Sequence, residues 1–436
     1  MNGAITPRTK MTQTSLLTQL QSIVGPDYAC APTTDHHVDI DGITPSAIVN
    51  PASYEEVAAV IRYANREGLA VIPLGNGDFR WIGNIPRRYD IALSVSRLNA
   101  IVEYEPADLT ITCQAGATLD ELSGPLSSNG QMLPFGKVPF SSRIGRLLAL
   151  RGRRSNLAWG SARDFTIGLR IVTADGRIIR TGGKVVKNVA GYDLTKLFIG
   201  SMGTLGVIVE ATFKLAPAPQ AEEQIELEFT SVAGACAFAS ELRRRGLSLW
   251  HLKLIGSMSS AEAGSSPRGH VALITDLAGT PAAVERSRRE ANELAANTGA
   301  KLEVTQRPKR EAPPAAWSTT GDPMMCQASV LPTEVPRLVE EVDQVAPGAF
   351  FEAAPLDGSV SMTWLGAGAD EELVHRIRAV TRRLGGTLIV IGCDTVLKRQ
   401  IDVFGDPPPA FDLMRRVKQQ LDPNGILSPG RFVGRL

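Results

Sequence analysis

Hydrophobic and polar positions in the first half of the chain alternate between the helical and the strand period. Apolar residues spaced three and four apart predict a helix over residues 53–68, which opens on a capping box and ends at a glycine. A second capping box, Thr118 with Glu121, predicts a helix that ends at Gly130. Short apolar runs predict strands at 70–73, 91–95, 100–104, 110–115, 167–173, 177–181 and 207–215.

The second half repeats one pattern twice. Residues 215–219 are rich in proline and alanine, which is typical of a stiff linker. Beyond them a β-α-β-β-α-β order over residues 222–304 recurs over 325–391, which predicts two ferredoxin-like units in one antiparallel sheet with helices on one face. The last segment predicts a helix over 409–420 and a tail at 422–432, whose turn residues favour a packed conformation.

The order of these elements indicates an α+β protein with four parts. We expect an N-terminal extension over residues 1–45 and a first domain of two α+β subdomains over 46–217. The duplicated sheet forms a cap domain over 218–400, and residues 401–436 form a helix and a tail that pack on the first domain. A chain of 436 residues is long enough for several such domains.

Composition disfavours several classes of function. Hydrophobic residues make up 43% and charged residues 21%, as in a soluble globular protein, and 46 basic against 45 acidic residues leave a net charge of +1. That balance argues against nucleic-acid or anionic-lipid partners. No apolar run approaches the roughly 20 residues of a membrane span, and the polar segment 1–14 lacks the apolar core of a signal peptide, so we expect a cytoplasmic protein. The five cysteines include no CxxC pair, which indicates reduced thiols and neither zinc nor an iron–sulfur cluster.

Glycine-rich segments form the candidate ligand site. Residues 75–79, Gly-Asn-Gly-Asp-Phe, follow a predicted strand, where consecutive backbone N–H groups can face an anion. No Gly-Lys-Ser/Thr follows, and no helix opens at Gly83, so this is neither a Walker A loop nor a Rossmann fingerprint. Glycine is also dense over 182–191 and 200–206, on both sides of a short amphipathic stretch with helical spacing at 194–198. This density indicates main chain wrapped against a flat or phosphorylated cofactor.

Together with the tail, these segments resemble the FAD-binding superfamily of vanillyl-alcohol oxidase and p-cresol methylhydroxylase. Residues 160–165 (Gly-Ser-Ala-Arg-Asp-Phe) and 187–193 (Lys-Asn-Val-Ala-Gly-Tyr-Asp) are especially similar to the FAD-binding subunit of bacterial glycolate oxidase, also called glycolate dehydrogenase. The resemblance covers residues 50–217 and the tail, and the cap domain matches in layout. It implies a p-cresol methylhydroxylase-type FAD-binding domain, a substrate domain, and FAD between the two.

The resemblance also implies three FAD-contacting regions. Backbone amides of the first would hold the pyrophosphate, the second would run along the FAD, and the third would meet the adenine and ribose. In this chain they correspond to Leu74, Gly75, Asn76, Gly77, Asp78 and Phe79; to Ile144, Gly145, Gly160, Ser161, Arg163 and Asp164; and to Gly203, Gly206 and Ile208. No histidine lies in the first loop, which implies non-covalent FAD. Arg146 and the bulky segment 147–151 stand where the family usually has a glycine and small residues.

A basic run overlaps the second region. Its members are Arg143, Arg146, Arg151, Arg153 and Arg154. We favour a solvated face for this run. The alternatives are a clamp on the FAD phosphates or a patch for an acidic partner subunit, because arginine binds oxyanions through two hydrogen bonds.

The histidines bear on the reaction, because oxidation of a 2-hydroxy acid needs a base beside the hydroxyl group while the flavin accepts the hydride. Relatives that act unaided carry a His-x-His motif in the second domain. Here His36-His37 is an adjacent pair without a third ligand, and His251, His270 and His375 are isolated. We favour an ordinary surface or core position for each of them, and His251, beside Trp250 and Lys253, is the one that departs most from it. The sequence therefore assigns no catalytic residue.

The resemblance and the isolated histidines imply an FAD-binding subunit of a glycolate oxidase-type complex. Its partners would be a catalytic flavoprotein subunit and an iron–sulfur subunit, which could also attach it peripherally to the inner membrane. The complex would oxidise glycolate to glyoxylate and pass electrons to a quinone or another non-nicotinamide acceptor. Two alternatives stay open: a free-standing FAD-dependent hydroxy-acid or alcohol dehydrogenase, and a flavin-free scaffold subunit.

Overall fold

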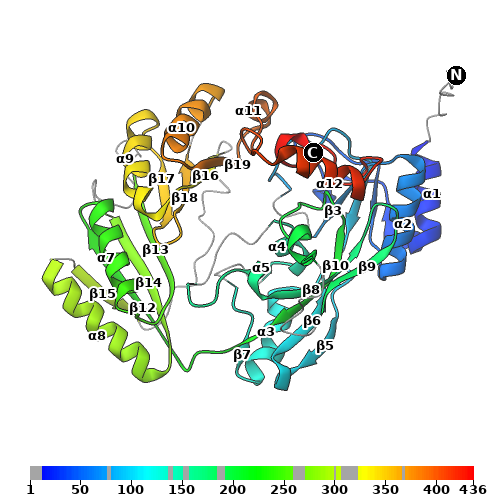
Figure 1. Cartoon of the computed structure of the whole chain (residues 1–436). Coiled ribbons are helices and arrows are strands. Elements are labelled where there is room, and N and C mark those ends of the chain that lie inside the picture. The colour runs from blue at the N-terminus through cyan, green and yellow to red at the C-terminus, as the bar shows by residue number, and fades with distance from the viewer. Residues whose placement is uncertain are drawn as a thin grey trace.

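The chain folds into two halves, each built around its own hydrophobic core. The computed structural model describes residues 12–75, 80–135, 141–150, 157–183, 192–258, 271–298, 301–305, 323–365 and 369–436. In Figure 1 the first half, blue to green, lies beside the second half, green to orange, and the red C-terminal segment returns to the first half. Among the helices of these described ranges, none is both long and apolar enough to cross a membrane.

The first sheet is small and mostly parallel. Its strands lie in the order β1 (Ala29–Cys30), β2 (Ala47–Val49), β4 (Ile91–Ser94) and β3 (Val71–Leu74), with only β1 antiparallel to its neighbour. Helices α1 (Gln13–Val24) and α2 (Tyr54–Glu67) share its core. As predicted, the Ser53 side chain caps α2 by accepting a hydrogen bond from the backbone N–H of Glu56, and Gly68 ends the helix in the left-handed conformation.

The second sheet is antiparallel throughout. Its order is β5 (Ile101–Glu105), β6 (Thr110–Gln114), β10 (Val207–Lys214), β8 (Thr166–Val172) and β9 (Ile178–Gly182). Gly176, at a φ of 76°, forms the β8–β9 turn that the sequence predicts. Around this sheet lie α3 (Leu119–Ser128), which has the predicted capping box, and α4 (Ile144–Ala149), α5 (Ala162–Phe165) and α6 (Thr195–Phe198).

The third sheet contains the predicted duplication. Its eight antiparallel strands lie in the order β15 (Lys301–Thr305), β12 (Ala221–Phe229), β14 (Val271–Gly279), β13 (Leu249–Ser257), β17 (Phe350–Ala354), β18 (Ser359–Trp364), β16 (Met324–Ser329) and β19 (Thr387–Gly392). The second strands of the two units, β13 and β17, pair at the centre, so each unit mirrors the other's strand order. Helices α7 (Val232–Arg244), α8 (Pro281–Thr298), α9 (Val335–Val345) and α10 (Glu371–Arg383) cover the face that points away from the first half (Figure 1). The predicted α+β class and the duplicated ferredoxin-like sheet are confirmed.

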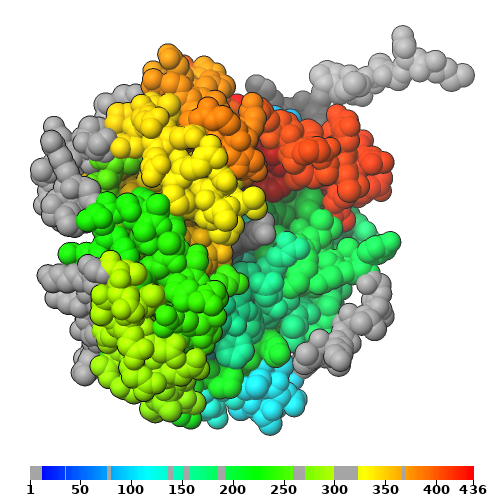
Figure 2. All heavy atoms as spheres, turned by 60° about the vertical axis from the view of Figure 1, so that its left-hand side comes forward, coloured from blue at the N-terminus to red at the C-terminus, as the bar shows by residue number. Residues whose placement is uncertain are grey.

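The C-terminal segment packs on the first half. After α11 (Thr395–Gln400) and α12 (Phe411–Leu421), Leu427 forms a parallel bridge with Val71 of β3. Two backbone hydrogen bonds hold it there, from Val71 to Ile426 at 2.8 Å and from Ser428 to Val71 at 2.9 Å. Figure 2 shows this red segment lying directly on the green surface of the first half.

Three local features differ from the expectation. We did not predict α1, whose residues Leu16, Leu20 and Val24 are buried at helical spacing. The proline- and alanine-rich segment 215–219, expected to be a linker, is partly a strand: β11 (Ala216–Pro217) forms a two-stranded sheet with β7 (Gln131–Met132). The amphipathic stretch at 194–198 buries only its last apolar side chain, and the leucines at 194 and 197 are exposed.

Candidate functional site

The first candidate region begins where β3 ends. Residues 76–79, which include Asn76, Gly77, Asp78 and Phe79, lie outside the described residues, whereas Leu74 and Gly75 are described. A Cβ atom added to Gly75 would lie 3.3 Å from Cδ of Arg143, so the start of the glycine loop and the start of α4 are in contact. Glycine lets the backbone approach the arginine stem this closely.

Arg143 and Arg146 are not solvated surface residues. Both are half-buried; Nη1 of Arg143 donates to the carbonyl oxygen of Gly116, and Nη2 of Arg146 donates to Oγ of Ser142. The solvated-face interpretation is therefore wrong for these two arginines. The other three members of the basic run, at 151, 153 and 154, lie outside the described residues.

Helix α4 explains why bulky residues follow Ile144 and Gly145. Ile144, Leu147 and Leu148 are all buried in the first core. The backbone N–H of Gly145 donates to the Ala115 carbonyl at 2.7 Å, and a Cβ atom at 145 would lie 3.0 Å from Cβ of Ala115. The glycine at 145 is therefore required by its packing on Ala115, which directly follows β6, and the leucines of α4 fill the core.

Ser161 and Asp164 form the capping box of α5, and Gly160, at a φ of 94°, directly precedes it. The backbone N–H and the hydroxyl of Ser161 donate to Oδ2 of Asp164 at 2.8 and 2.7 Å. Partial burial would raise the pKa of Asp164, but these hydrogen bonds and the nearby charges of Lys196 and Arg163 outweigh it and lower that pKa. The contacts give these residues a structural role at the start of β8, and their contact with FAD stays a prediction.

The third candidate region meets β3 and the tail. Gly203 has a φ of 72°, and a Cβ atom there would lie 3.2 Å from Cγ of Pro73 and 3.4 Å from Oγ of Ser428. Gly206 and Ile208 instead face the protein interior: a Cβ atom at 206 would lie 2.6 Å from Cγ2 of Ile171, and Ile208 is buried. Of this region, Gly203 is thus the residue that lies beside the end of β3.

The first and third regions consequently converge on one place, the end of β3 between Pro73 and Gly75. Polar atoms at this place retain hydrogen-bonding capacity: within the described residues, Nε of Arg143 and the hydroxyl oxygen of Ser428 are buried without a partner. Buried polar groups normally have a partner. A guanidinium and a hydroxyl are donors that suit the oxygens of a diphosphate or a ribose, so these residues fit FAD.

Lys418 of α12 holds the third region in place, and the sequence analysis did not identify it. The ammonium group is buried and donates to the carbonyls of Thr204 and Leu427 at 2.8 Å each and to Oδ2 of Asp422 at 2.5 Å. The signal in the sequence was a lysine and an aspartate four residues apart at the end of a helix.

The described histidines do not form one cluster. His36 hydrogen-bonds to Thr33, the exposed His375 lies 3.3 Å from Glu371 on the outer side of α10, and position 270 lies outside the described residues. His251 lies on β13, two residues from Lys253, on the sheet face opposite the core leucines at 252 and 254. Among the described residues, no three His, Cys, Asp or Glu side chains are placed to hold a metal ion.

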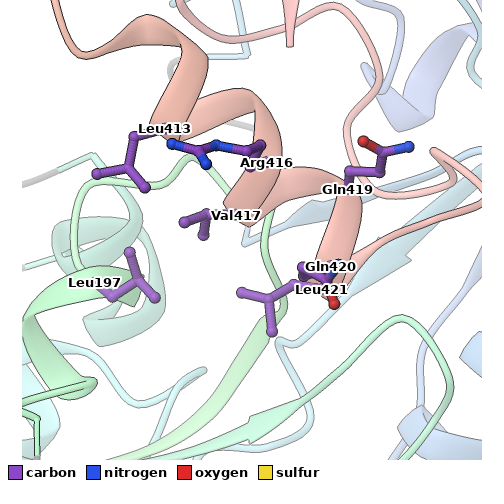
Figure 3. A pocket seen from close by; sticks show the side chains of 7 residues that line it. All are labelled: Leu197, Leu413, Arg416, Val417, Gln419, Gln420 and Leu421. Carbon is purple, nitrogen blue, oxygen red and sulfur yellow. The ribbon is translucent and has the colours of Figure 1, made fainter.

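A separate apolar groove lies on the surface between α6 and α12. Its volume is about 620 Å³, and Figure 3 shows side chains of α12 facing Leu197 of α6 across it. Its lining residues are Leu197, Leu413, Arg416, Val417, Gln419, Gln420 and Leu421. None of the residues implied by the resemblance lines this groove.

Two family models match most of the chain. The FAD binding domain matches residues 45–182, and the C-terminal domain of FAD linked oxidases matches residues 218–432. The fold agrees: the structure of p-cresol methylhydroxylase with substrate bound superposes with a TM-score of 0.73 at 18% identity, covering 96% of each chain. The p-cresol methylhydroxylase type of fold and the FAD cofactor are thereby confirmed.

Two curated relatives are subunits of glycolate oxidases. Glycolate oxidase subunit GlcE of Escherichia coli is 29% identical over 349 residues, which is 79% of this chain and 87% of that subunit. Glycolate oxidase subunit GlcD of Bacillus subtilis is 33% identical over 202 residues, but the match spans only 45% of this chain and 43% of GlcD. From the two domain matches and the shared fold, the chain belongs to the superfamily of FAD-linked oxidases.

Proposed function

We propose that the chain is the FAD-binding subunit of a glycolate oxidase-type complex that oxidises a small 2-hydroxy acid, glycolate to glyoxylate. The observation that carries this proposal is the similarity to the GlcE subunit over 87% of that subunit's length, in a chain with both domains of an FAD-linked oxidase. When bound, FAD supplies the acceptor for the hydride that leaves the hydroxyl-bearing carbon. Electrons then pass to a non-nicotinamide acceptor.

Residues at the end of β3 would hold the diphosphate of FAD. The backbone N–H groups of the loop at 75–79 would face the phosphate oxygens, with Arg143 beside Gly75 as a second donor. Gly203 would leave room for the ribose side of the cofactor. We place the FAD-binding domain at 46–217, the substrate domain at 218–400, and the helix and tail that pack on the first domain at 401–436.

The proposed partners are a catalytic flavoprotein subunit and an iron–sulfur subunit. The sequence supports this with its five single cysteines, which leave cluster ligands to another chain. The scattered histidines support it too, because the substrate hydroxyl proton needs a base that such a partner could supply. The complex would lie in the cytoplasm, with peripheral attachment to the inner membrane through its partners.

A free-standing FAD-dependent hydroxy-acid dehydrogenase is the second candidate, and one observation favours it. His251 and Lys253 alternate with the core residues Leu252 and Leu254, so they lie on the sheet face that the helices leave uncovered. An imidazole there could accept a proton, and Nζ of Lys253, which lies 3.6 Å from Oε2 of Glu352, could bind a substrate carboxylate. The flavin-free scaffold has no such support. The departure that suggested it spans residues 146–151, and within that segment Leu147 and Leu148 are core residues.

Dye-linked glycolate oxidation separates the two candidates. The chain is purified alone, loaded with FAD, and compared with the complex obtained by co-purifying its native partners. For a subunit, we expect the chain alone to show flavin absorbance but to reduce the dye much more slowly than the complex. Full activity of the chain alone would instead identify a free-standing dehydrogenase.

A further inference from the structure

The C-terminal tail places a strained serine beside β3. Ser428 has a φ of 45°, in the left-handed region that residues other than glycine, asparagine and aspartate rarely adopt. Both of its backbone polar groups are hydrogen-bonded: the N–H donates to the carbonyl of Val71 at 2.9 Å, and the carbonyl accepts from the N–H of Arg431 at 3.2 Å. The residue is only 1% exposed, and within the described residues its hydroxyl oxygen has no hydrogen-bond partner.

A serine at position 428 is unfavourable for the fold in two ways. Glycine adopts the left-handed conformation without strain, as Gly430 does two residues later at a φ of 88°. The buried hydroxyl of Ser428 loses its hydrogen bonds to water and gains none from the described part of the chain. Strained residues and buried polar groups without a partner are typical of ligand sites, so Ser428 indicates a partner from outside the chain.

Gly203 lies directly beside this hydroxyl. A Cβ atom at 203 would lie 3.4 Å from Oγ of Ser428 and 3.2 Å from Cγ of Pro73, so a longer side chain there would crowd the hydroxyl. The residue before the glycine, Met202, also has a left-handed φ, of 54°. Two left-handed turns therefore meet at the end of β3, and one of them carries the hydroxyl.

Lys418 fixes these two turns relative to each other. Its buried ammonium group donates at 2.8 Å to the carbonyl of Thr204, next to Gly203, and to the carbonyl of Leu427, next to Ser428. Because one cation holds both backbones, the serine is positioned beside the glycine before a ligand binds. Such preorganisation reduces the conformational freedom that binding would otherwise remove.

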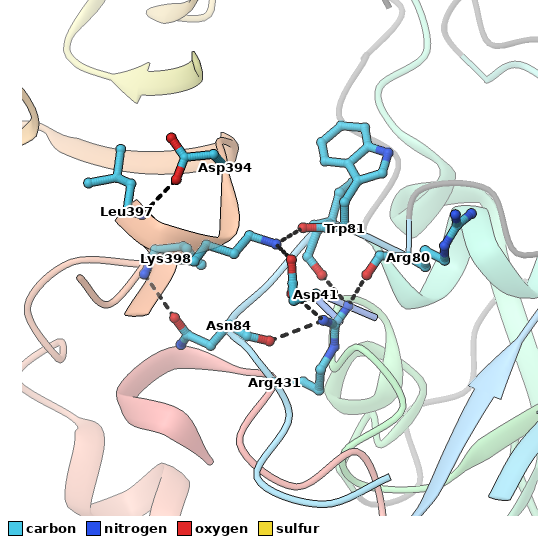
Figure 4. A network of polar contacts seen from close by, with 10 residues as sticks. Asp41, Arg80, Trp81, Asn84, Asp394, Leu397, Lys398 and Arg431 are labelled. Atoms are coloured by element: carbon cyan, nitrogen blue, oxygen red, sulfur yellow. Dashed lines mark hydrogen bonds and ion pairs between the residues drawn. The ribbon is translucent and has the colours of Figure 1, made fainter. Parts of the chain in front are cut away.

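A charged cluster holds the tail on the other side of Ser428 (Figure 4). Oδ1 of Asp41 lies 2.7 Å from Nζ of Lys398, and Oδ2 lies 3.7 Å from Nη1 of Arg431, which follows Ser428 by three residues. Lys398 and Arg431 also donate to backbone carbonyls within residues 80–84. The serine therefore lies on a segment that buried cations anchor at both ends.

We propose that the hydroxyl of Ser428 hydrogen-bonds to an oxygen of the diphosphate or the adjoining ribose of FAD, which makes the tail part of the cofactor site. FAD at the end of β3 is part of the proposed function, on which this assignment rests. A hydroxyl suits both groups, because it donates to a phosphate oxygen and can donate to or accept from a ribose hydroxyl.

FAD titrations of the apoprotein with two variants of Ser428 test this assignment. Ser428→Ala removes the hydroxyl, and Ser428→Gly also relieves the backbone strain. We expect each variant to raise the FAD dissociation constant roughly fivefold to tenfold, the effect of losing one hydrogen bond. Ser428→Gly should unfold at no lower urea concentration than the wild type. Weaker cofactor binding without weaker folding is a combination that a purely structural serine would not produce.

Two matched controls repeat these changes elsewhere in the chain. His37→Gly relieves the same strain at an exposed residue whose φ is 46°. Ser287→Ala removes a buried hydroxyl of the second half, which donates to the Ala283 carbonyl at 2.7 Å. We expect neither control to change the FAD dissociation constant, although Ser287→Ala should lower the urea midpoint. Equal losses of FAD affinity in the controls and in the Ser428 variants would overturn the inference.

ADP and adenosine locate the partner of the hydroxyl. If Ser428→Ala weakens ADP alone, the partner is on the diphosphate, and if it weakens both ligands equally, the partner is on the ribose. Unchanged ADP affinity, or wild-type FAD affinity in both Ser428 variants, would overturn the inference.

Arg143→Met separates that failure from a failure of the proposed FAD site, because Arg143 is the other donor at the end of β3. If Arg143→Met weakens FAD and the Ser428 variants do not, only the role of the serine is wrong. If all three variants bind FAD as the wild type does, the placement of FAD at the end of β3 is wrong as well.

Discussion

Buried lysine and arginine side chains serve mainly as donors to backbone carbonyl oxygens in this protein. Lys418 binds two carbonyls, Lys398 one, and Arg431 three, and each also has a carboxylate nearby. Burial of a charge is unfavourable unless hydrogen bonds and an opposite charge compensate it. Each of these cations therefore fixes a segment that has no regular secondary structure of its own.

Gly203 permits a first prediction at the scale of single residues. Gly203→Ala would strain a backbone at a φ of 72° and press a methyl group against Pro73, whereas Gly246→Ala, at a φ of 64°, would meet no atom within 4 Å. We expect Gly246→Ala to lower the free energy of unfolding by about 1 kcal/mol through backbone strain. Gly203→Ala should lower it by more, because of the added contact with Pro73, and should also weaken FAD binding. Urea unfolding and FAD titration measure both. Equal costs and unchanged FAD affinity would contradict the packing role of position 203.

Asp164 permits a prediction about pH. Its folded-state pKa is lowered, so the ionised carboxylate stabilises the fold above the unfolded-state value of about 3.9, and this contribution disappears as pH falls through the folded-state pKa. Asp164→Asn should therefore lower the free energy of unfolding by about 1 kcal/mol at neutral pH, which is the usual contribution of a helix cap. The difference between the two proteins should become progressively smaller below a pH of about 4. Urea unfolding of both proteins across this range tests it. A difference that does not shrink in acid would rule out the carboxylate as its source.

At the scale of elements, capping residues and hydrophobic periodicity within short segments were enough to predict most helices and strands. The helix at 119–128 has its predicted capping box, and the helix at 54–67 has the predicted Ser53 cap, although the Glu56 carboxylate accepts from the backbone N–H of Ala52 instead of Ser53. All twelve elements of the duplicated sheet appear in the predicted order. Helix α6 shows the limit of this information. Its leucines have helical spacing, yet Leu197 lies at the surface groove beside α12, because only one turn of helix forms and only Phe198 reaches the core.

Helix α12 permits a prediction about an element. Lys418→Met would remove the ammonium that pairs with the buried Asp422 and leave the Thr204 and Leu427 carbonyls without its hydrogen bonds. Breaking a buried ion pair from one side should cost about 3–5 kcal/mol. Arg416→Met, an exposed change on the same helix, is the control and should stay within about 0.5 kcal/mol of the wild type. Similar urea midpoints for the two variants would show that Lys418 does not support this helix.

At the scale of the whole molecule, the C-terminal tail joins both halves. Its residues Ile426 and Leu427 are fully buried in the first core, Leu427 bridges to β3, and Arg431 joins the charged cluster with Lys398. A segment near the C-terminus therefore contacts residues that lie more than 300 positions earlier in the chain.

Deletion of residues 423–436 tests this dependence. The deletion removes two core side chains and the guanidinium that orients residues 80–84, so we expect a lower thermal midpoint and loss of bound FAD on gel filtration. Val396→Ser, at a side chain that is 68% exposed, is a control that should change neither. Retention of FAD by the shortened chain would show that the first half holds the cofactor without the tail.

The sequence by itself determined the order of helices and strands, the duplication in the second half and the FAD-linked family, because periodicity, capping and glycine motifs act over neighbouring residues. Only the tertiary structure decided which glycines serve packing, as at 145 and 206, and which lie beside the end of β3, as at 75 and 203. It alone brought Asp41, Lys398 and Arg431 together around residues 80–84. Such contacts depend on the burial of distant segments against one another, which no local pattern encodes.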